Sequence, residues 1–332
     1  MDSGETNLYI MENKNGKLAM SDNKTLIIKS SANDFERYYS HRMSGNGNEV
    51  KEYLKPHISA DNMIWKFVLK IIRRLDAVVP IYTTLFGDWW KSISQYDRII
   101  VFDYNATPQM MRRIRKSRPD VELLLWVWNT APDNIEDFKK YSKIYCFDSS
   151  SCEKWNLLYN SQFYFFPDKE ILDIQNSLEI IRDIYFIGAD KGRFKILEKL
   201  AKTFVDLELK YEFEVLSNRK YKENLFIKIL DKPKDYIDII REISRSKCIL
   251  EIVKEEQDGI SLRVLEALFL NKKLITNNKK IINYDFYKKE NIFVLGKDRL
   301  YDLKEFLDSP FCEISDDIKR RYSYNEWLKR MH

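Results

Sequence analysis

Glycine, proline, cysteine and histidine are all scarce in this chain, and each shortage excludes a class of protein. The 332 residues include only 9 glycines, 8 prolines, 4 cysteines and 3 histidines. Ordinary proteins contain about 7% glycine and about 5% proline, so the composition excludes fibrous and low-complexity chains. There is no C-x-x-C pair and no cluster of histidines, so we expect neither a disulfide framework nor a metal site.

Long apolar runs are also absent. No stretch approaches the ~20 residues that cross a bilayer, and the polar start of the sequence lacks the basic and then apolar layout of a signal peptide. We therefore expect a cytoplasmic protein. The net charge is +5, from 56 basic and 51 acidic residues. This excess is small for a dedicated nucleic-acid binder, although it suits an anionic partner.

What is present is the composition of a globular protein, with 44% hydrophobic and 32% charged residues. At about 150 residues per domain, the length predicts two domains. Short apolar runs alternate with stretches of helical period, which predicts α/β architecture with mainly parallel sheets. We expect two Rossmann-like, doubly wound domains that face each other across a cleft, with ligands bound beyond the carboxyl ends of the strands.

The predicted domain boundary is the polar segment 168–177, which interrupts the regular spacing of the strands. It separates an N-terminal domain at 1–170 from a C-terminal domain at 180–310, and a helix at 311–332 is expected to pack back on the first domain. Predicted strands cover 25–29, 98–103, 121–128, 143–147, 162–166, 183–187, 211–216, 225–230, 248–253, 273–276 and 291–295. Predicted helices cover 61–76, 108–116, 132–141, 149–159, 191–204, 233–246, 261–270 and 298–307.

Two of the few glycines lie in the sequence YFIGADKGR, between the first strand and the first helix of the second half. Gly188 and Gly192 let this loop pass close to a ligand, and the helix that follows offers free N–H groups to an anion. Lys191 and Arg193 add cations at the same place. The G-x-G-x-x-G pattern of nicotinamide sites is absent. An ordinary strand-to-helix turn with solvated charges explains the pattern equally well.

A second glycine turn opens the segment DGISLRVLEALFLNKKLIT, which predicts a turn, a helix and a buried strand. After Gly259, the residues Ser261 and Arg263 lie at the helix start, where a diphosphate can bind. Glu266 shares a face with Arg263 and offers a carboxylate to ribose hydroxyls. The alternative is a surface Arg–Glu pair of little energetic value.

The segment 258–276 resembles the donor-binding segment of GT-B glycosyltransferases. More closely, the chain resembles bacterial glycosyltransferases of capsule, O-antigen and lipooligosaccharide biosynthesis, on the segments 147–155, 184–193, 259–276 and 283–287. The resemblance implies transfer of a sugar from a nucleoside diphosphate sugar, UDP-linked by expectation, to a surface-glycan acceptor that is lipid-linked or an oligosaccharide. The first domain would bind the acceptor and the second the nucleotide-sugar, which is a co-substrate and not a cofactor.

The same resemblance implies roles for the residues of both glycine turns. Glu266 would bind the ribose, and Arg263 and Ser261 would bind the diphosphate. The loop that contains Gly188 would line the cleft beside the phosphates, with Lys191 and Arg193 as its cations. Retaining GT-B enzymes often carry two glutamates separated by seven residues. Here Asp258 stands in the first place, so we favour inversion with a general base.

Asp103, at the end of the strand predicted at 98–103, is the expected catalytic base. Asp34, Asp88, His41 and His57 are the competing candidates, and an aspartate at a strand end also serves as a turn former or helix cap. The sequence contains no Asp-x-Asp triplet, which predicts metal-independent catalysis with cations and helix dipoles stabilising the leaving diphosphate.

Basic residues are concentrated in two segments. The amphipathic stretch 62–76 has a basic face, and a second segment places five cations in seven positions: Arg112, Arg113, Arg115, Lys116 and Arg118. Both are candidates for contact with an anionic membrane surface that carries the acceptor. Core-facing helices with solvated basic faces are the alternative. At the level of function, the alternatives are a non-catalytic protein that binds nucleotide or glycan, and a nucleic-acid-binding module.

Overall fold

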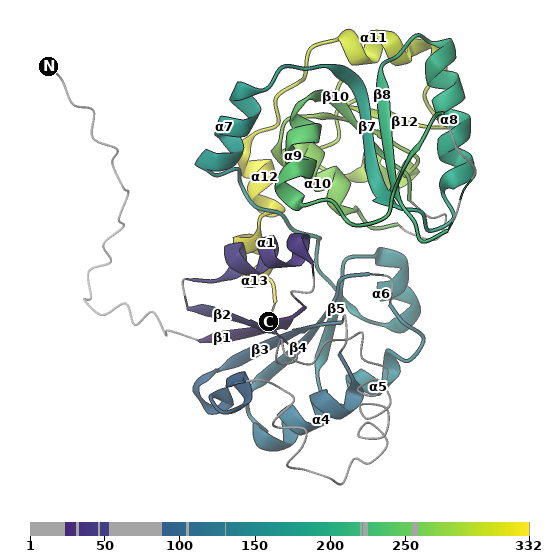
Figure 1. Ribbon diagram of the computed structural model, residues 1–332. Coiled ribbons are helices and arrows are strands. Elements are labelled where there is room, and N and C mark those ends of the chain that lie inside the picture. Colours follow the sequence, from purple (N-terminus) through teal and green to yellow (C-terminus); the bar gives the residue numbers. More distant parts are fainter. Residues whose placement is uncertain are drawn as a thin grey trace, which may run out of the picture.

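The computed structural model describes residues 24–30, 33–45, 47–52, 88–103, 106–129, 131–219, 221, 225–253 and 258–331. These residues form two α/β domains, one above the other in Figure 1, each built around a six-stranded sheet. The strand pairs within both sheets are parallel. The predicted fold class, with two doubly wound domains, is confirmed.

The first sheet has the strand order β2-β1-β3-β4-β5-β6. Its strands are β1 (Thr25–Lys29), β2 (Asn48–Glu52), β3 (Arg98–Phe102), β4 (Glu122–Val127), β5 (Lys143–Cys146) and β6 (Leu158–Tyr159). The central runs RIIVF and ELLLWV are almost wholly apolar, as expected for parallel strands covered on both faces. The described residues of this domain form the helices α1 (Asp34–Met43), α4 (Pro108–Ser117), α5 (Glu136–Lys139) and α6 (Ser149–Trp155), with short 3-10 turns at Asp88–Trp90 and Ile93–Gln95.

The second sheet has the strand order β12-β11-β10-β7-β8-β9. Its strands are β7 (Arg182–Ala189), β8 (Tyr211–Leu216), β9 (Lys228–Leu230), β10 (Ser246–Glu251), β11 (Lys273–Thr276) and β12 (Ile292–Val294). The helices are α7 (Lys169–Ser177), α8 (Phe194–Asp206), α9 (Tyr236–Ser244), α10 (Leu262–Phe269) and α11 (Leu303–Asp308), with 3-10 turns at Lys279–Asn283 and Leu300–Asp302. The strand order reverses between β7 and β10, and this switch point is where such sheets bind ligands.

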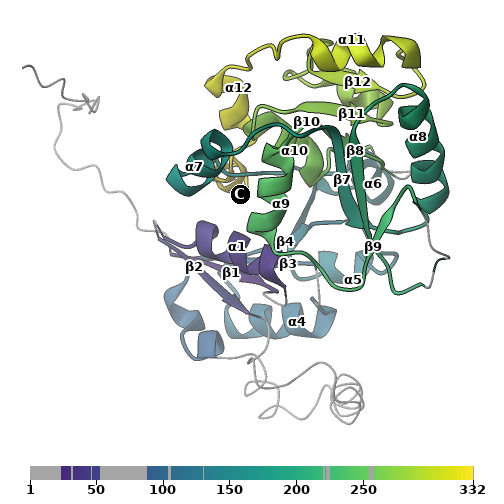
Figure 2. The ribbon, with the colours of Figure 1, turned by 45° about the horizontal axis from the view of Figure 1, so that its top comes forward.

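The two domains meet through α1 and α9, whose ends lie together in both ribbon views (Figures 1 and 2). The backbone N–H of Tyr236, at the start of α9, donates to the carboxylate of Asp34 at the start of α1, over 2.7 Å. The ring of Tyr236 also lies 4.7 Å from that of Tyr38 and 5.2 Å from that of Phe35. The contact therefore combines aromatic packing with one charge-assisted hydrogen bond.

The end of the chain returns to the first domain. After α12 (Asp316–Arg321), helix α13 (Tyr324–Lys329) places Trp327 in the core, with its ring 5.2 Å from Trp126 of β4 and 4.4 Å from Phe163. Tyr164 exchanges two backbone hydrogen bonds of 2.9 Å with Tyr322 and Tyr324. The two passages of the chain between the domains therefore lie side by side.

One prediction about this region is wrong. The segment 162–166 is not a strand, because β6 ends at Tyr159 and Tyr164 forms only an isolated bridge with Ser323. Its apolar run serves instead as buried aromatic packing between the domains. The polar segment 168–177, predicted as the domain boundary, forms helix α7, which is capped by Asp168, whose carboxylate accepts from the N–H of Ile171. Its polar composition reflects a half-exposed helix.

Other differences are smaller. Helix α5 is shorter than the predicted 132–141, and the predicted helix 149–159 ends early, because Asn156 adopts the left-handed φ of 47° and β6 follows. Helix α1 and strand β2 were not predicted. The predicted helix at 61–76 lies outside the described residues.

Candidate functional site

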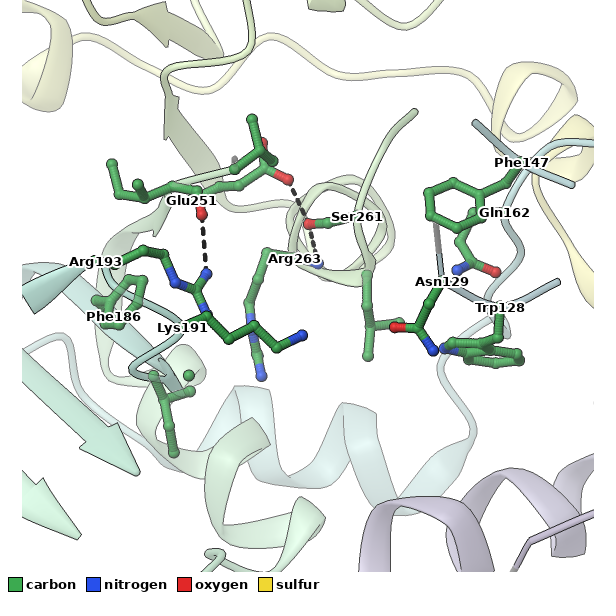
Figure 3. A pocket seen from close by; sticks show the side chains of 15 residues that line it. Trp128, Asn129, Phe147, Gln162, Phe186, Lys191, Arg193, Glu251, Ser261 and Arg263 are labelled. Atoms are coloured by element: carbon green, nitrogen blue, oxygen red, sulfur yellow. Dashed lines mark hydrogen bonds between the residues drawn. The ribbon is translucent and has the colours of Figure 1, made fainter. Parts of the chain in front are cut away.

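A cavity of about 300 Å³ lies between the two sheets (Figure 3). The first domain contributes four residues to its wall: Trp128, Asn129, Phe147 and Gln162. The second domain contributes the end of β7 with the loop after it, the end of β10, and the start of α10. The cavity thus lies at the switch point of the second sheet, at the carboxyl ends of its strands.

Within the part of the chain that the structure describes, three cationic side chains line this cavity. Lys191 and Arg193 come from the loop after β7, and Arg263 comes from the first turn of α10. Lys191 and Gly192 adopt left-handed φ values of 43° and 83°, which turns the loop sharply before α8. Figure 3 shows the Lys191 and Arg263 side chains extending toward the same part of the cavity. Cations from two separate elements therefore share one wall, which favours an anionic ligand.

Arg193 is held by backbone carbonyl groups. Its guanidinium donates to the oxygens of Ile252, at 2.9 Å, and Ala189, at 2.5 Å, and lies over the ring of Phe186. Burial and, next, the charge of Arg263 lower the pKa of Arg193. The absence of a side chain on Gly188 makes room for this arrangement, because a Cβ there would lie 3.3 Å from the guanidinium. Repulsion between the two arginines would be relieved by an anion between them.

The start of α10 is anchored by a buried carboxylate. Ser261 caps the helix by accepting from the N–H of Arg263 at 3.1 Å, and its hydroxyl donates to Glu251 at the end of β10. The other oxygen of Glu251 accepts from the hydroxyl of Thr276 on β11. Burial raises the pKa of Glu251, while these two hydroxyl groups oppose the rise. Hydrogen bonds therefore join two strands and one helix at the cavity wall.

Glu266 is fully buried and does not line the cavity. Its carboxylate accepts from the guanidinium of Arg263 and, over 2.8 Å, from the hydroxyl of Tyr236. The hydroxyl of Tyr236 lies 2.7 Å from that of Tyr164. Burial raises the pKa of Tyr236 well above its usual value, so this hydroxyl stays protonated and available as a donor. In this structure Glu266 therefore holds the guanidinium of Arg263 without lining the cavity itself. A contact between Glu266 and ribose stays a prediction.

Gly259 also lies away from the cavity wall and contacts the other domain. Its N–H donates to the carboxylate of Asp148 at 3.0 Å, and a Cβ at this position would lie 2.6 Å from the ring of Phe147. Of the predicted donor-site residues, the structure brings five to the cavity and places Gly259 and Glu266 behind its wall. The five are Gly188, Lys191, Arg193, Ser261 and Arg263.

Asp103, the predicted base, lines a second, smaller cavity of about 60 Å³ in the first domain. Its carboxylate accepts from the backbone N–H of Trp128 at 3.1 Å. Trp128 and Asn129 line both cavities, so the two adjoin. The smaller cavity is lined by polar and charged residues together with four aromatic ones: Phe35, Tyr39, Phe102 and Trp128.

The competing candidates for the base lie elsewhere. Asp34 accepts the hydrogen bond from the start of α9, and His41 is exposed near the end of α1. The side chain of Asp88 and the whole of His57 lie outside the described residues.

Several lining residues of the larger cavity had no predicted role in the site, among them Trp128, Phe147, Gln162 and Glu251. A signal existed for Glu251, since it is a lone carboxylate in the apolar run CILEIV near the end of a predicted parallel strand. The sequence predicts Gln162 as the first residue of a strand, and Phe147 begins the segment 147–155 that carries the resemblance. Their position on the cavity depends on how the domains dock.

The basic cluster of α4 is partly used inside its own domain. Arg115 donates to the carbonyl oxygens of Tyr141, Pro119 and Val121, and Arg118 donates to that of Ile93. These bonds tie α4 to the loops around it. The basic segment 62–76 lies outside the described residues. Among the residues that are described, no helix is long and apolar enough to cross a membrane.

Comparison with known proteins supports this architecture. No protein-family model and no curated protein matches the chain by sequence. Trehalose-6-phosphate synthase OtsA matches 92% of this chain and 97% of its own, with a TM-score of 0.59 and 12% identity. Sucrose-phosphate synthase from Thermosynechococcus elongatus matches 92% of this chain and 96% of its own, with a TM-score of 0.54 and 9% identity. HepE from Anabaena, in complex with UDP and glucose, matches 93% of this chain and 98% of its own, with a TM-score of 0.50 and 9% identity. The chain has the two-domain GT-B fold of these proteins.

Proposed function

We propose that this protein is a glycosyltransferase that moves a sugar from a nucleoside diphosphate sugar, UDP-linked, to a hydroxyl of a glycan acceptor. The observation that carries the proposal is the group of three cations, Lys191, Arg193 and Arg263, on one cavity at the switch point of the second sheet. A diphosphate is the ligand that such a wall and the neighbouring start of α10 would stabilise. The UDP bound to the structurally similar HepE supports the same ligand class.

On this proposal the three cations also serve catalysis. Negative charge builds up on the diphosphate as the bond to the sugar breaks, and fixed cations in a partly buried cavity stabilise that charge. The arginine side chains are already held in place, Arg193 by the backbone and Arg263 by Glu266, so little reorganisation is needed. We therefore propose that transfer is metal-independent.

We propose that the acceptor enters beside the smaller cavity, where Asp103 lies. Aromatic rings such as those of Phe35 and Trp128 offer flat apolar faces to a sugar ring. Asp103 would take the proton of the acceptor hydroxyl as its oxygen attacks the anomeric carbon, and the diphosphate would leave with the electron pair of the broken bond. One displacement of this kind inverts the anomeric configuration.

The acceptor class rests on the resemblance to capsule, O-antigen and lipooligosaccharide transferases. We propose a bacterial surface glycan, as an oligosaccharide or on a lipid carrier, and a protein that binds reversibly to the inner face of the cell membrane. Three cations of α4, Arg112, Arg113 and Lys116, are half-buried or exposed on that helix. They are the candidates for attraction to anionic lipid.

Replacing Arg263 with alanine tests the donor site. The variant removes one charged hydrogen-bond donor from the cavity wall, which should weaken the binding free energy of UDP by about 2–4 kcal/mol. The Kd for UDP measured by calorimetry should therefore rise about 30- to 1,000-fold. Arg299→Ala is the matched control, since Arg299 is exposed and pairs with Asp302 away from the cavity. An unchanged Kd in Arg263→Ala would remove the basis of the proposal.

The role of Glu266 is resolved by comparing ligands in the same experiment. If Glu266 contacts ribose, Glu266→Gln should weaken uridine and UDP alike. If it acts by orienting Arg263, only the binding of UDP should weaken. Tight UDP binding by the wild type without turnover of any nucleotide-sugar would identify a non-catalytic binding protein.

Replacing Asp103 with asparagine tests the base. Asparagine keeps an oxygen that can accept from the N–H of Trp128 but cannot take a proton, so kcat should fall about 10²- to 10⁴-fold with the Kd for UDP unchanged. Asp120→Asn, at an exposed position, is the control. Wild-type activity in Asp103→Asn would exclude this residue as the base. Proton NMR of the fresh product reports the anomeric configuration, and retention would rule out the single displacement.

Chelation tests metal independence. Because the cations of the cavity wall are proposed to stabilise the leaving diphosphate, the initial rate with a saturating nucleotide-sugar should be the same with and without EDTA. A rate that disappears with EDTA and returns with manganese or magnesium would show that the cations are insufficient.

Sedimentation with lipid vesicles tests the membrane contact. Wild-type protein should sediment with anionic vesicles at low salt and be released as salt shortens the Debye length to ~8 Å. The triple variant Arg112→Gln, Arg113→Gln, Lys116→Gln should lose this binding and keep UDP affinity. A variant with the same loss of charge on the exposed side of α8 is the control: Lys195→Gln, Lys199→Gln, Lys202→Gln. Equal sedimentation of both variants would argue against α4 as the contact.

A further inference from the structure

Asp148 belongs to the first domain but holds the backbone of the second. It follows β5 and caps α6, where one carboxylate oxygen accepts from the N–H of Ser151 at 2.9 Å. The other oxygen accepts from the N–H groups of Asp258 at 2.8 Å and Gly259 at 3.0 Å. Only 1% of Asp148 is exposed. One buried carboxylate therefore binds three backbone donors from both domains.

The hydrogen bonds around Asp148 stabilise its ionised carboxylate. Burial by itself raises the pKa of Asp148, but the hydrogen bonds from Gly259 and Ser151 outweigh burial and bring the pKa below its usual value. Asp148 is therefore ionised across the neutral pH range, and each of its hydrogen bonds is charge-assisted.

Three neighbouring contacts confine the same segment. A Cβ on Gly259 would lie 2.6 Å from the ring of Phe147 and 2.7 Å from its carbonyl oxygen, so the backbones pass too closely for any side chain. The hydroxyl of Ser150 donates to the carboxylate of Asp258, which also pairs with Lys280. The segment Asp258–Gly259 is thus packed against the first domain from several directions.

Residues that closely follow this segment in the sequence line the cavity. Two residues after Gly259, Ser261 caps α10, and Arg263 follows in the first helical turn. Both line the cavity, as does Phe147 on the opposite side, whereas Asp148 does not. We propose that Asp148 is a positioning residue of the donor site, which fixes the start of α10, and with it Arg263, from across the domain interface. The effect on UDP rests on the proposed function; the effect on the backbone does not.

Two measurements on Asp148→Ala test this inference. Hydrogen exchange of the amides between residues 258 and 265 should be accelerated, because two of them lose their acceptor. The Kd for UDP should rise about 10- to 100-fold as Arg263 loses its fixed position. Gly259→Ala should have the same direction of effect, because the added methyl group meets the backbone of Phe147. The double variant should be no worse than the more severe single variant, since both act on one contact.

Thr107→Ala is the matched control. Thr107 caps α4 of the same domain by accepting from the N–H of Met110 at 3.2 Å, so this variant loses one helix cap, as Asp148→Ala does. It should leave both the exchange at 258–265 and the Kd for UDP unchanged. If Asp148→Ala does not fold, Asp148→Asn and Gly259→Ala take its place, with the asparagine expected to have the smaller effect because it keeps one acceptor oxygen.

Unchanged exchange at 258–265 in the Asp148 and Gly259 variants would overturn the inference. So would accelerated exchange with an unchanged Kd for UDP, because the segment would then be fixed without effect on the cavity. If the wild type itself does not bind UDP, the proposed function fails, and the exchange measurement alone decides whether Asp148 holds the start of α10.

Discussion

The structure depends on the aromatic packing that joins its two sheets into one core. Tyr39 on α1, Phe163 and Phe165 on the passage between the domains, and Tyr236 on α9 belong to the same buried cluster. The ring of Tyr39 lies 4.9 Å from that of Phe165 and 5.8 Å from that of Phe163. Because these rings come from both domains, the relative position of the sheets is set by packing rather than by a linker.

The cavity is a consequence of that docking. Its cations come from the second domain, while Trp128 and Phe147 come from the first, so neither domain forms it alone. Aromatic and cationic walls facing each other suit a ligand with a charged diphosphate at one end and a sugar at the other. The division of labour proposed for the reaction, with donor on one domain and acceptor on the other, follows from this asymmetry.

The same buried core also reaches Arg263 on the cavity wall. The hydroxyl groups of Tyr164 and Tyr236 are hydrogen-bonded to each other. The hydroxyl of Tyr236 donates to the carboxylate of Glu266, which also accepts from the guanidinium of Arg263. A buried carboxylate is tolerated only when its hydrogen bonds are satisfied, and here two donors satisfy it. The orientation of one cavity residue is therefore linked to the passage of the chain between the domains. Asp148 holds the same helix start from the other side.

The two-domain architecture and five of the residues that line the cavity could be predicted from local sequence patterns. Buried parallel strands need nearly continuous apolar runs, which made the strands at Thr25–Lys29 and Lys273–Thr276 recognisable, and the residues around Gly188 and Arg263 lie at strand ends and helix starts, which are local features. Three features depend on how the two sheets dock: Glu266 faces inward, Gly259 contacts Asp148, and the apolar run 162–166 packs between the domains. The contact between Gly259 and Asp148 joins residues 111 positions apart. No local pattern encodes such a pairing, because it exists only once the two sheets have docked.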